Sequence, residues 1–166
     1  MTPTMATSER LQKFIDAQDD VVAGRSGVSE YELALSEMRE GRKTTHWIWF
    51  IFPQIPLGTS PMAVKYAIDD RQHALDFISH GVLGPRLRQI TSVALEQLDP
   101  PNLVAPRSLM GSDIDCKKLA SSMTLFSLAA ATGDEDFRQV CNRVLTHLAT
   151  HGHPECNKTK DWWSRS

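Results

Sequence analysis

Apolar residues recur every three or four positions along most of the chain, the spacing that places them on one face of an α-helix. The best start signal is the capping box of Ser29 and Glu32, in which each side chain satisfies a backbone amide of the first turn. We count about seven such segments, which begin at or near Leu11, Ser29, Ser60, Asp70, Gly84, Asp113 and Asp134. The pattern predicts an all-α fold, a compact single-domain bundle of about seven short helices.

One segment does not show this periodicity. Residues His46–Phe52 read HWIWFIF, a short and continuous aromatic run. Over this length, periodicity does not separate a buried strand from a buried helix. The residue types favour a strand, but no second strand is predicted to pair with it. We therefore expect a buried helical or irregular segment. The proline-rich stretch Asp99–Pro106 is expected to be a loop.

Length, charge and cysteine content exclude several classes of protein. The 166 residues are the usual size of one domain, which we assign to 1–166 with flexible tails at 1–8 and 157–166. The net charge of −2 offers no basic stripe for nucleic acid. No apolar run is long enough to cross a bilayer or act as a signal peptide, and three scattered cysteines do not form a disulfide scaffold. We expect a reduced cytoplasmic protein with no nucleic-acid or membrane partner.

The run GRKTTHWIWFIFPQ, at residues 41–54, resembles the signature of the domain-of-unknown-function family 1810. Members of this bacterial and fungal family sometimes carry the label calpastatin. Further segments match in the same order: LQKFIDAQ at 11–18, YAI at 66–68, VLGPRL at 82–87 and KLASSMTLF at 118–126. The resemblance implies a compact all-α domain and no established activity. The connector 19–28 and the loop near Pro100 look longer than the family pattern, and residues 151–166 match only loosely.

The aromatic run supplies the first candidate site. Large apolar side chains such as Trp47 and Trp49 are usually core residues, and this is the simpler interpretation. Alternatively, they wall a cleft in which His46 and Gln54 supply the few polar groups that a ligand site needs. Because histidine exchanges protons near neutral pH, His46 is the candidate for proton transfer.

The segment KLASSMTLF supplies the second candidate site. On a helix, Lys118 lies near Ser121 and Ser122 on one face, where the three could bind a phosphate or carboxylate. Two simpler interpretations remain open. Asp115 could pair with Lys118, and the serine hydroxyls could bond to helix carbonyls one turn earlier.

Two further cations, Arg42 and Lys43, precede the aromatic run. At a helix end their charges would be favourable for the helix dipole alone, but beside His46 they could also meet an anion. Together the residues predict a pocket between HWIWFIFPQ and KLASSMTLF. Its ligand would be a nucleotide-like or other anionic metabolite that stacks on tryptophan and pairs with Arg42, Lys43 or Lys118.

The C-terminal region contains residue types that bind metal. His147, His151, His153 and Cys156 follow the pattern H-x3-H-x-H-x2-C, but no second Cys-x-x-Cys pair is present, so we assign no metal site. Trp162 and Trp163 are expected to dock on the body of the protein or to meet a partner chain, with docking favoured.

Two hypotheses of function follow. The first is a small-molecule-binding helical domain. If it is an enzyme, it would hydrolyse or cleave a nucleotide-like substrate, with His46 for proton transfer and Lys118 to bind the anion. The second is a non-catalytic domain for protein–protein interaction, which would use a helical face and the Trp162–Trp163 pair. The sequence identifies no cofactor and leaves open whether the protein is an enzyme.

Overall fold

The computed structural model describes the backbone of residues 3–166 and the side chains of residues 9–166. Helix makes up 65% of the structure. No strand occurs in the described residues, where one isolated bridge joins Val21 and Ser29. The helices are α1 (Pro3–Asp19), α2 (Glu30–Arg39), α3 (Ile48–Ile51), α4 (Pro61–Lys65), α5 (Arg71–Ser79), α6 (Leu83–Leu98), α7 (Pro106–Met110), α8 (Asp113–Ala130), α9 (Glu135–Thr150) and α10 (Asn157–Arg165).

The fold class is confirmed, but the predicted number of about seven helices is wrong, because the described residues form ten. The additional helices are α3, α7 and α10. With four and five residues, α3 and α7 are too short to show a 3.6-residue period. Helix α10, NKTKDWWSR, is mostly polar and was expected to be a flexible tail. Of the other expected tail, residues 1–2 lie outside the described residues and residues 3–8 belong to α1.

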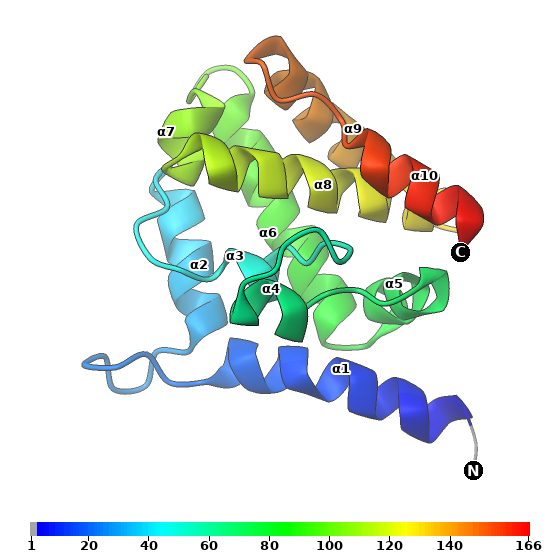
Figure 1. The fold of residues 1–166 in the computed structure, drawn as a ribbon. Helices are drawn as coiled ribbons and strands as arrows, with labels where there is room; N and C mark the ends of the chain where they lie inside the picture. The colour runs from blue at the N-terminus through cyan, green and yellow to red at the C-terminus, as the bar shows by residue number, and fades with distance from the viewer. Residues whose placement is uncertain (1–2) are drawn as a thin grey trace.

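Helix α8 lies at the centre of the arrangement. It packs against α5, α7, α9 and α10, while α6 contacts α2, α5 and α9. Helix α1 covers the opposite side of the molecule, where it contacts α2, α3 and α5. Figure 1 shows α10 in red alongside α8, with the segment around α3 and α4 between α8 and α1. Within the described chain, no helix combines the length and apolar character needed to cross a membrane.

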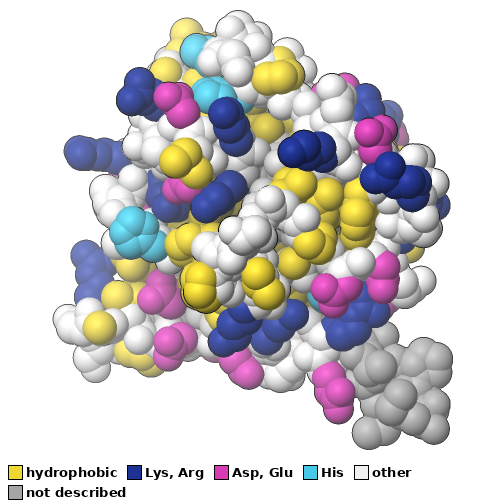
Figure 2. All heavy atoms as spheres, viewed as in Figure 1, with side chains coloured by type: hydrophobic (Ala, Val, Ile, Leu, Met, Phe, Trp, Pro, Cys, Tyr) yellow, Lys and Arg dark blue, Asp and Glu magenta, His cyan; other side chains and the backbone are white. Residues whose placement is uncertain are grey.

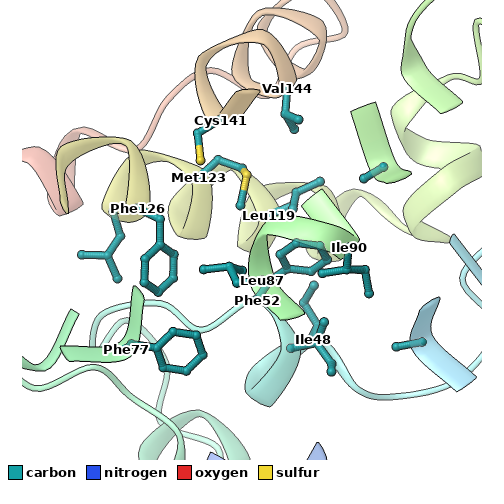
Figure 3. Close-up of a cluster of buried hydrophobic side chains, with 14 of the residues drawn as sticks. Ile48, Phe52, Phe77, Leu87, Ile90, Leu119, Met123, Phe126, Cys141 and Val144 are labelled. Carbon is teal, nitrogen blue, oxygen red and sulfur yellow. The ribbon is translucent and has the colours of Figure 1, made fainter. Parts of the chain in front are cut away.

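The aromatic run forms part of the core, and its central four residues are helical, as expected for a buried helical segment. Trp47 and Phe52, which flank α3, have exposed fractions of 0% and 1%. Figure 3 shows Ile48 and Phe52 among side chains from α6 and α8, such as Leu87 and Met123. Burying rings of this size is a large part of what stabilises the core.

Candidate functional site

The connector before the aromatic run is anchored by the buried carboxylate of Glu37, in α2. Its Oε1 accepts hydrogen bonds from the amides of Thr44 (2.7 Å) and Thr45 (3.1 Å) and from the indole of Trp47 (3.0 Å). Its Oε2 accepts from the Thr45 hydroxyl at 2.7 Å. Burial raises the pKa of Glu37, but these hydrogen bonds outweigh burial and leave it below its ordinary value. Trp47 is thus held as a core residue with no surface left for a ligand.

Lys43 is buried as well, and its charge already has partners. Its Nζ lies 2.8 Å from a carboxylate oxygen of Asp115 and donates to the carbonyl of Thr45 at 2.6 Å. The same ammonium lies 5.0 Å from the centroid of the Trp47 ring. Asp115 therefore pairs with Lys43 and not with Lys118, and little of the Lys43 charge remains for a ligand.

His46 and Arg42 are both exposed. With Lys43 and Asp115, His46 lines a hollow of about 180 Å³. The structure therefore brings together three of the predicted site residues from two separate segments. Pockets that hold metabolites are usually larger than about 300 Å³, so this hollow is too small for a nucleotide-like ligand.

Lys118 and Trp49 are also brought together. The Lys118 ammonium lies 4.8 Å from the centroid of the partly buried Trp49 ring, at the separation of a cation–π contact. Gln54, at the end of the run, is partly buried, and its carbonyl accepts the Ile68 amide at 2.9 Å.

The two predicted serines differ in their surroundings. Ser121 donates its hydroxyl to the carbonyl of Lys117 at 3.1 Å, which is the alternative expected for a serine within a helix. Ser122 has an exposed fraction of 0%, so a bound ligand would not reach it. Of the two, Ser121 borders a cavity.

That cavity, which we call the α8–α10 pocket, has a volume of about 340 Å³. It is lined by Leu57, Lys117, Ala120, Ser121, Gly152, His153, Pro154, Cys156 and Lys158. Leu57 follows the aromatic run by a few residues, and Ser121 belongs to KLASSMTLF. Its lining includes Ala120 and Ser121 of KLASSMTLF but no residue of HWIWFIFPQ. The cavity therefore differs from the predicted pocket, and Ser121 is the one predicted site residue that it shares.

The α8–α10 pocket combines an apolar wall with positive charge. Leu57, Ala120 and Pro154 are apolar, and Lys117 and Lys158 form no ion pair with any described side chain. In Figure 2, hydrophobic side chains gather between α4 and the α8–α10 pair, with lysine and arginine side chains around them.

Two larger hollows lack this combination. The first, about 460 Å³, lies along the loop after α6, where its cation Arg143 is paired with Asp99. The second, about 420 Å³, lies against α9 and contains a carboxylate, Glu155, but no cation among its described lining residues. Neither lining includes a described residue with a buried polar atom that lacks a partner.

A family model described as Protein of unknown function (DUF1810) matches residues 8–155. The chain belongs to this family. The resemblance carried by the aromatic run is thereby confirmed. The match ends one residue before Cys156, so the α10 side of the α8–α10 pocket lies beyond it.

The fold of this DUF1810 member is similar to one solved by crystallography. The conserved hypothetical protein Rv1873 from Mycobacterium tuberculosis is 32% identical, with a TM-score of 0.70. The similarity covers 93% of this chain and 96% of that chain. No curated protein matches the chain.

In this DUF1810 chain, a buried histidine faces the α8–α10 pocket. His153 has an exposed fraction of 9%, and its Nε2 lies 3.4 Å from a carboxylate oxygen of Asp113. Its Nδ1 is buried and has no hydrogen-bond partner among the described residues. His153 thus contributes a buried ring to the wall of the pocket.

Cys156 is the N-cap residue of α10 and is partly exposed in the same pocket. Burial raises the pKa of its thiol, but the hydroxyls of Ser121 and Thr159 and the amides of Lys158 and Thr159 lower it by more. The net pKa is below the ordinary value, which favours the thiolate. By contrast, burial raises the pKa of Cys116 to about 11.

The structure does not bring the four residues that were considered as metal ligands together at one site, although His153 and Cys156 both line the α8–α10 pocket. His147 lies 2.7 Å from Asp99, and Nδ1 of His151 lies 3.0 Å from the carbonyl of His147. Across the described side chains, no group of three or more His, Cys, Asp or Glu could hold a metal ion.

Sequence reasoning missed Lys117, Lys158 and the thiol chemistry of Cys156. One signal was present in the sequence. Lys117 and Ser121 are four residues apart on a predicted helix and therefore share a face. The pairing of that face with residues 152–158 depends on long-range packing, which no local pattern reveals.

Proposed function

We propose that this protein binds an anionic small molecule in the α8–α10 pocket. The single observation that carries the proposal is a cavity of about 340 Å³ with an apolar wall and two lysines that form no ion pair with the described side chains. Binding sites for metabolites combine such a wall with a few polar groups that orient the ligand. Lys117 and Lys158 would pair with a phosphate or carboxylate, and Leu57 and Ala120 would contact the apolar part.

The start of α10 supports the same ligand class. Lys158 lies in the first turn of this nine-residue helix, and amides of a first turn have no partner within their helix. Unpaired amides and the helix dipole both favour negative charge.

The proposal assigns binding and no reaction. His46, the predicted group for proton transfer, lines the smaller hollow with Lys43 and Asp115 and is not among the residues of the α8–α10 pocket. An activity that needs His46 would therefore require a ligand extending from one hollow to the other.

Calorimetric titration of the protein with AMP, ADP-ribose and inorganic phosphate tests the proposal. We expect the Lys117→Ala/Lys158→Ala variant to bind about ten-fold more weakly for each lysine charge removed, which corresponds to about 1.4 kcal/mol per charge. Lys160→Ala is the matched control, since Lys160 lies on the same helix but pairs with Glu155 at 2.7 Å. Binding equal to that of wild type in the double variant would refute the cationic role, and no binding of any probe would refute the ligand class.

Protein–protein interaction, the alternative, is not favoured by a specific surface. The large hydrophobic side chains that are exposed lie on separate elements: Val21, Leu57, Val64, Val82, Leu103 and Ile114. Exposed hydrophobic side chains that are scattered in this way are common and do not by themselves indicate a partner.

A further inference from the structure

Cys156 differs from the other two cysteines in both position and access. Cys116 and Cys141 are buried in the core, whereas Cys156 is partly exposed and lines the α8–α10 pocket. As the N-cap of α10, it lies next to the amides that open the helix. A reactive cysteine needs this combination of access and a positive electrostatic environment.

Groups around Cys156 lack partners in the folded chain. The Thr159 hydroxyl has an exposed fraction of 0% and no hydrogen-bond partner among the described residues. Thr159 lies three residues after the N-cap, one turn along the helix from Cys156, whose side chain makes no capping hydrogen bond in the structure. A thiolate at Cys156 would give this hydroxyl an acceptor. Nδ1 of His153, in the wall of the same cavity, is likewise buried and has no hydrogen-bond partner among the described residues.

We propose that Cys156 is a thiol–disulfide exchange site for low-molecular-weight disulfides that carry carboxylates. The thiolate sulfur attacks one sulfur of the disulfide, whose S–S bond breaks as the new S–S bond to Cys156 forms. The other half leaves as a thiolate and takes a proton from water, so Cys156 is oxidised to the mixed disulfide and the leaving half is reduced to a thiol. Recognition of the carboxylates by Lys117 and Lys158 rests on the proposed function, but the reactivity of the thiol does not.

Alkylation with iodoacetamide, which is uncharged, tests the thiol alone. Peptide mass mapping of the native full chain should find Cys156 modified, and Cys116 and Cys141 modified only in urea. The alkylation rate should rise with pH around a midpoint below about 8.5, the ordinary pKa of cysteine. A midpoint at or above that value, or equal modification of all three cysteines in the native chain, would overturn the proposal.

Thr159→Val tests the role of the hydroxyl. Since this hydroxyl has no hydrogen-bond partner among the described residues, valine should fill the same space without destabilising the fold. The midpoint of the alkylation profile should move to higher pH, while Thr146→Val, at an exposed position of α9, should leave it unchanged. If Thr159→Val does not fold, Ser121→Ala provides the same comparison from α8. Unchanged midpoints in both pocket variants would overturn the assignment.

The reaction rates of two disulfide reagents distinguish failure of the exchange reaction from failure of the proposed anion binding. Glutathione disulfide carries carboxylates, and hydroxyethyl disulfide is neutral. We expect the first to react about ten-fold faster with Cys156, and the ratio to fall towards one in Lys117→Ala/Lys158→Ala. Equal rates in wild type would refute the cationic role of the lysines and leave the exchange reaction standing. No mixed disulfide with either reagent would refute the exchange site and leave the calorimetric test of anion binding unaffected.

Discussion

At the scale of single residues, the carboxylate of Glu37 accepts the backbone hydrogen bonds that regular secondary structure would otherwise provide. Two of its hydrogen bonds come from backbone amides of the connector that leads into α3, a segment without helical hydrogen bonds of its own. Amides that are partly withdrawn from water need an acceptor, and here one carboxylate serves both amides as well as the buried Trp47 indole. The position of the aromatic run therefore depends on one side chain in α2.

We predict that Glu37→Ala lowers the free energy of unfolding by about 3 kcal/mol or more, because the buried Trp47 indole and the partly buried donors of Thr44 and Thr45 lose their acceptor. Glu37→Gln should cost less, since one oxygen remains. Urea unfolding followed by tryptophan fluorescence measures both changes. Glu40→Ala, at an exposed position just after α2, is the control. A Glu37→Ala variant as stable as this control would contradict the anchoring role.

His73 makes stability depend on pH. It is 1% exposed, its Nδ1 accepts the Asp69 amide at 3.0 Å, and its Nε2 lies 3.2 Å from the carbonyl of Arg10. Burial and the charge of Arg10 lower its pKa, an effect that Asp69 only partly offsets. The unfolded chain therefore binds a proton more readily than the folded one. This contribution to stability is present above the unfolded pKa of about 6.5 and is lost as the pH falls below it.

The melting temperature should accordingly fall between pH 7.5 and pH 5, by roughly 2–4 °C for each kcal/mol of stability that disappears. His73→Asn should flatten this part of the profile, because the asparagine oxygen can accept the Asp69 amide without taking up a proton. His151→Asn, at an exposed position, should keep the wild-type slope. An unchanged slope in His73→Asn would assign the pH dependence to other groups.

At the scale of elements, tertiary packing stabilises α10 as a helix although its local sequence favours helix only weakly. A nine-residue polar helix is marginal on its own, but Trp162 and Trp163 pack against the core. Arg71 of α5 donates to the carbonyl of Trp163 at 2.6 Å, and its guanidinium lies 5.0 Å from the ring of that tryptophan. The pair of tryptophans thus helps to hold α10 on the core, where the helix also contacts α8.

Trp163→Ala should lower the free energy of unfolding by about 1–3 kcal/mol, because it removes buried apolar surface and the cation–π interaction with Arg71. It should also make the segment after Pro154 more susceptible to limited proteolysis. Ser164→Ala, at an exposed neighbouring position, should change neither property. Equal stability and equal proteolysis in the two variants would show that α10 is not held by this tryptophan.

At the scale of the whole molecule, one hydrophobic cluster extends from Leu11 in α1 to Leu148 in α9. Elements that share one core lose their packing together. We predict a single cooperative transition in urea, with circular dichroism at helical wavelengths and tryptophan fluorescence giving the same midpoint. Separate midpoints would indicate that part of the chain unfolds independently.

The sequence predicted the long helices well because their apolar stripes and caps are local. Ser29, Asp70 and Asp134 all accept an amide of the first turn, as expected of N-caps. The candidate site was predicted less well. His46 and Asp115 line the same hollow, but Asp115 pairs with Lys43, and Trp47 belongs to the core. Residue type alone does not show whether a charge is already neutralised by a distant partner.

The sequence by itself determined the fold class, the family and most of the long helices, because amphipathic periodicity, capping and a distinctive motif are read over short distances along the chain. Only the tertiary structure decided that residues 157–165 are a docked helix and that residues 152–158 meet one face of α8. The physical reason is that a pocket is a property of surfaces brought together by packing. Which of its charged and polar groups are paired, and which are not, is decided only when segments distant in the sequence pack together.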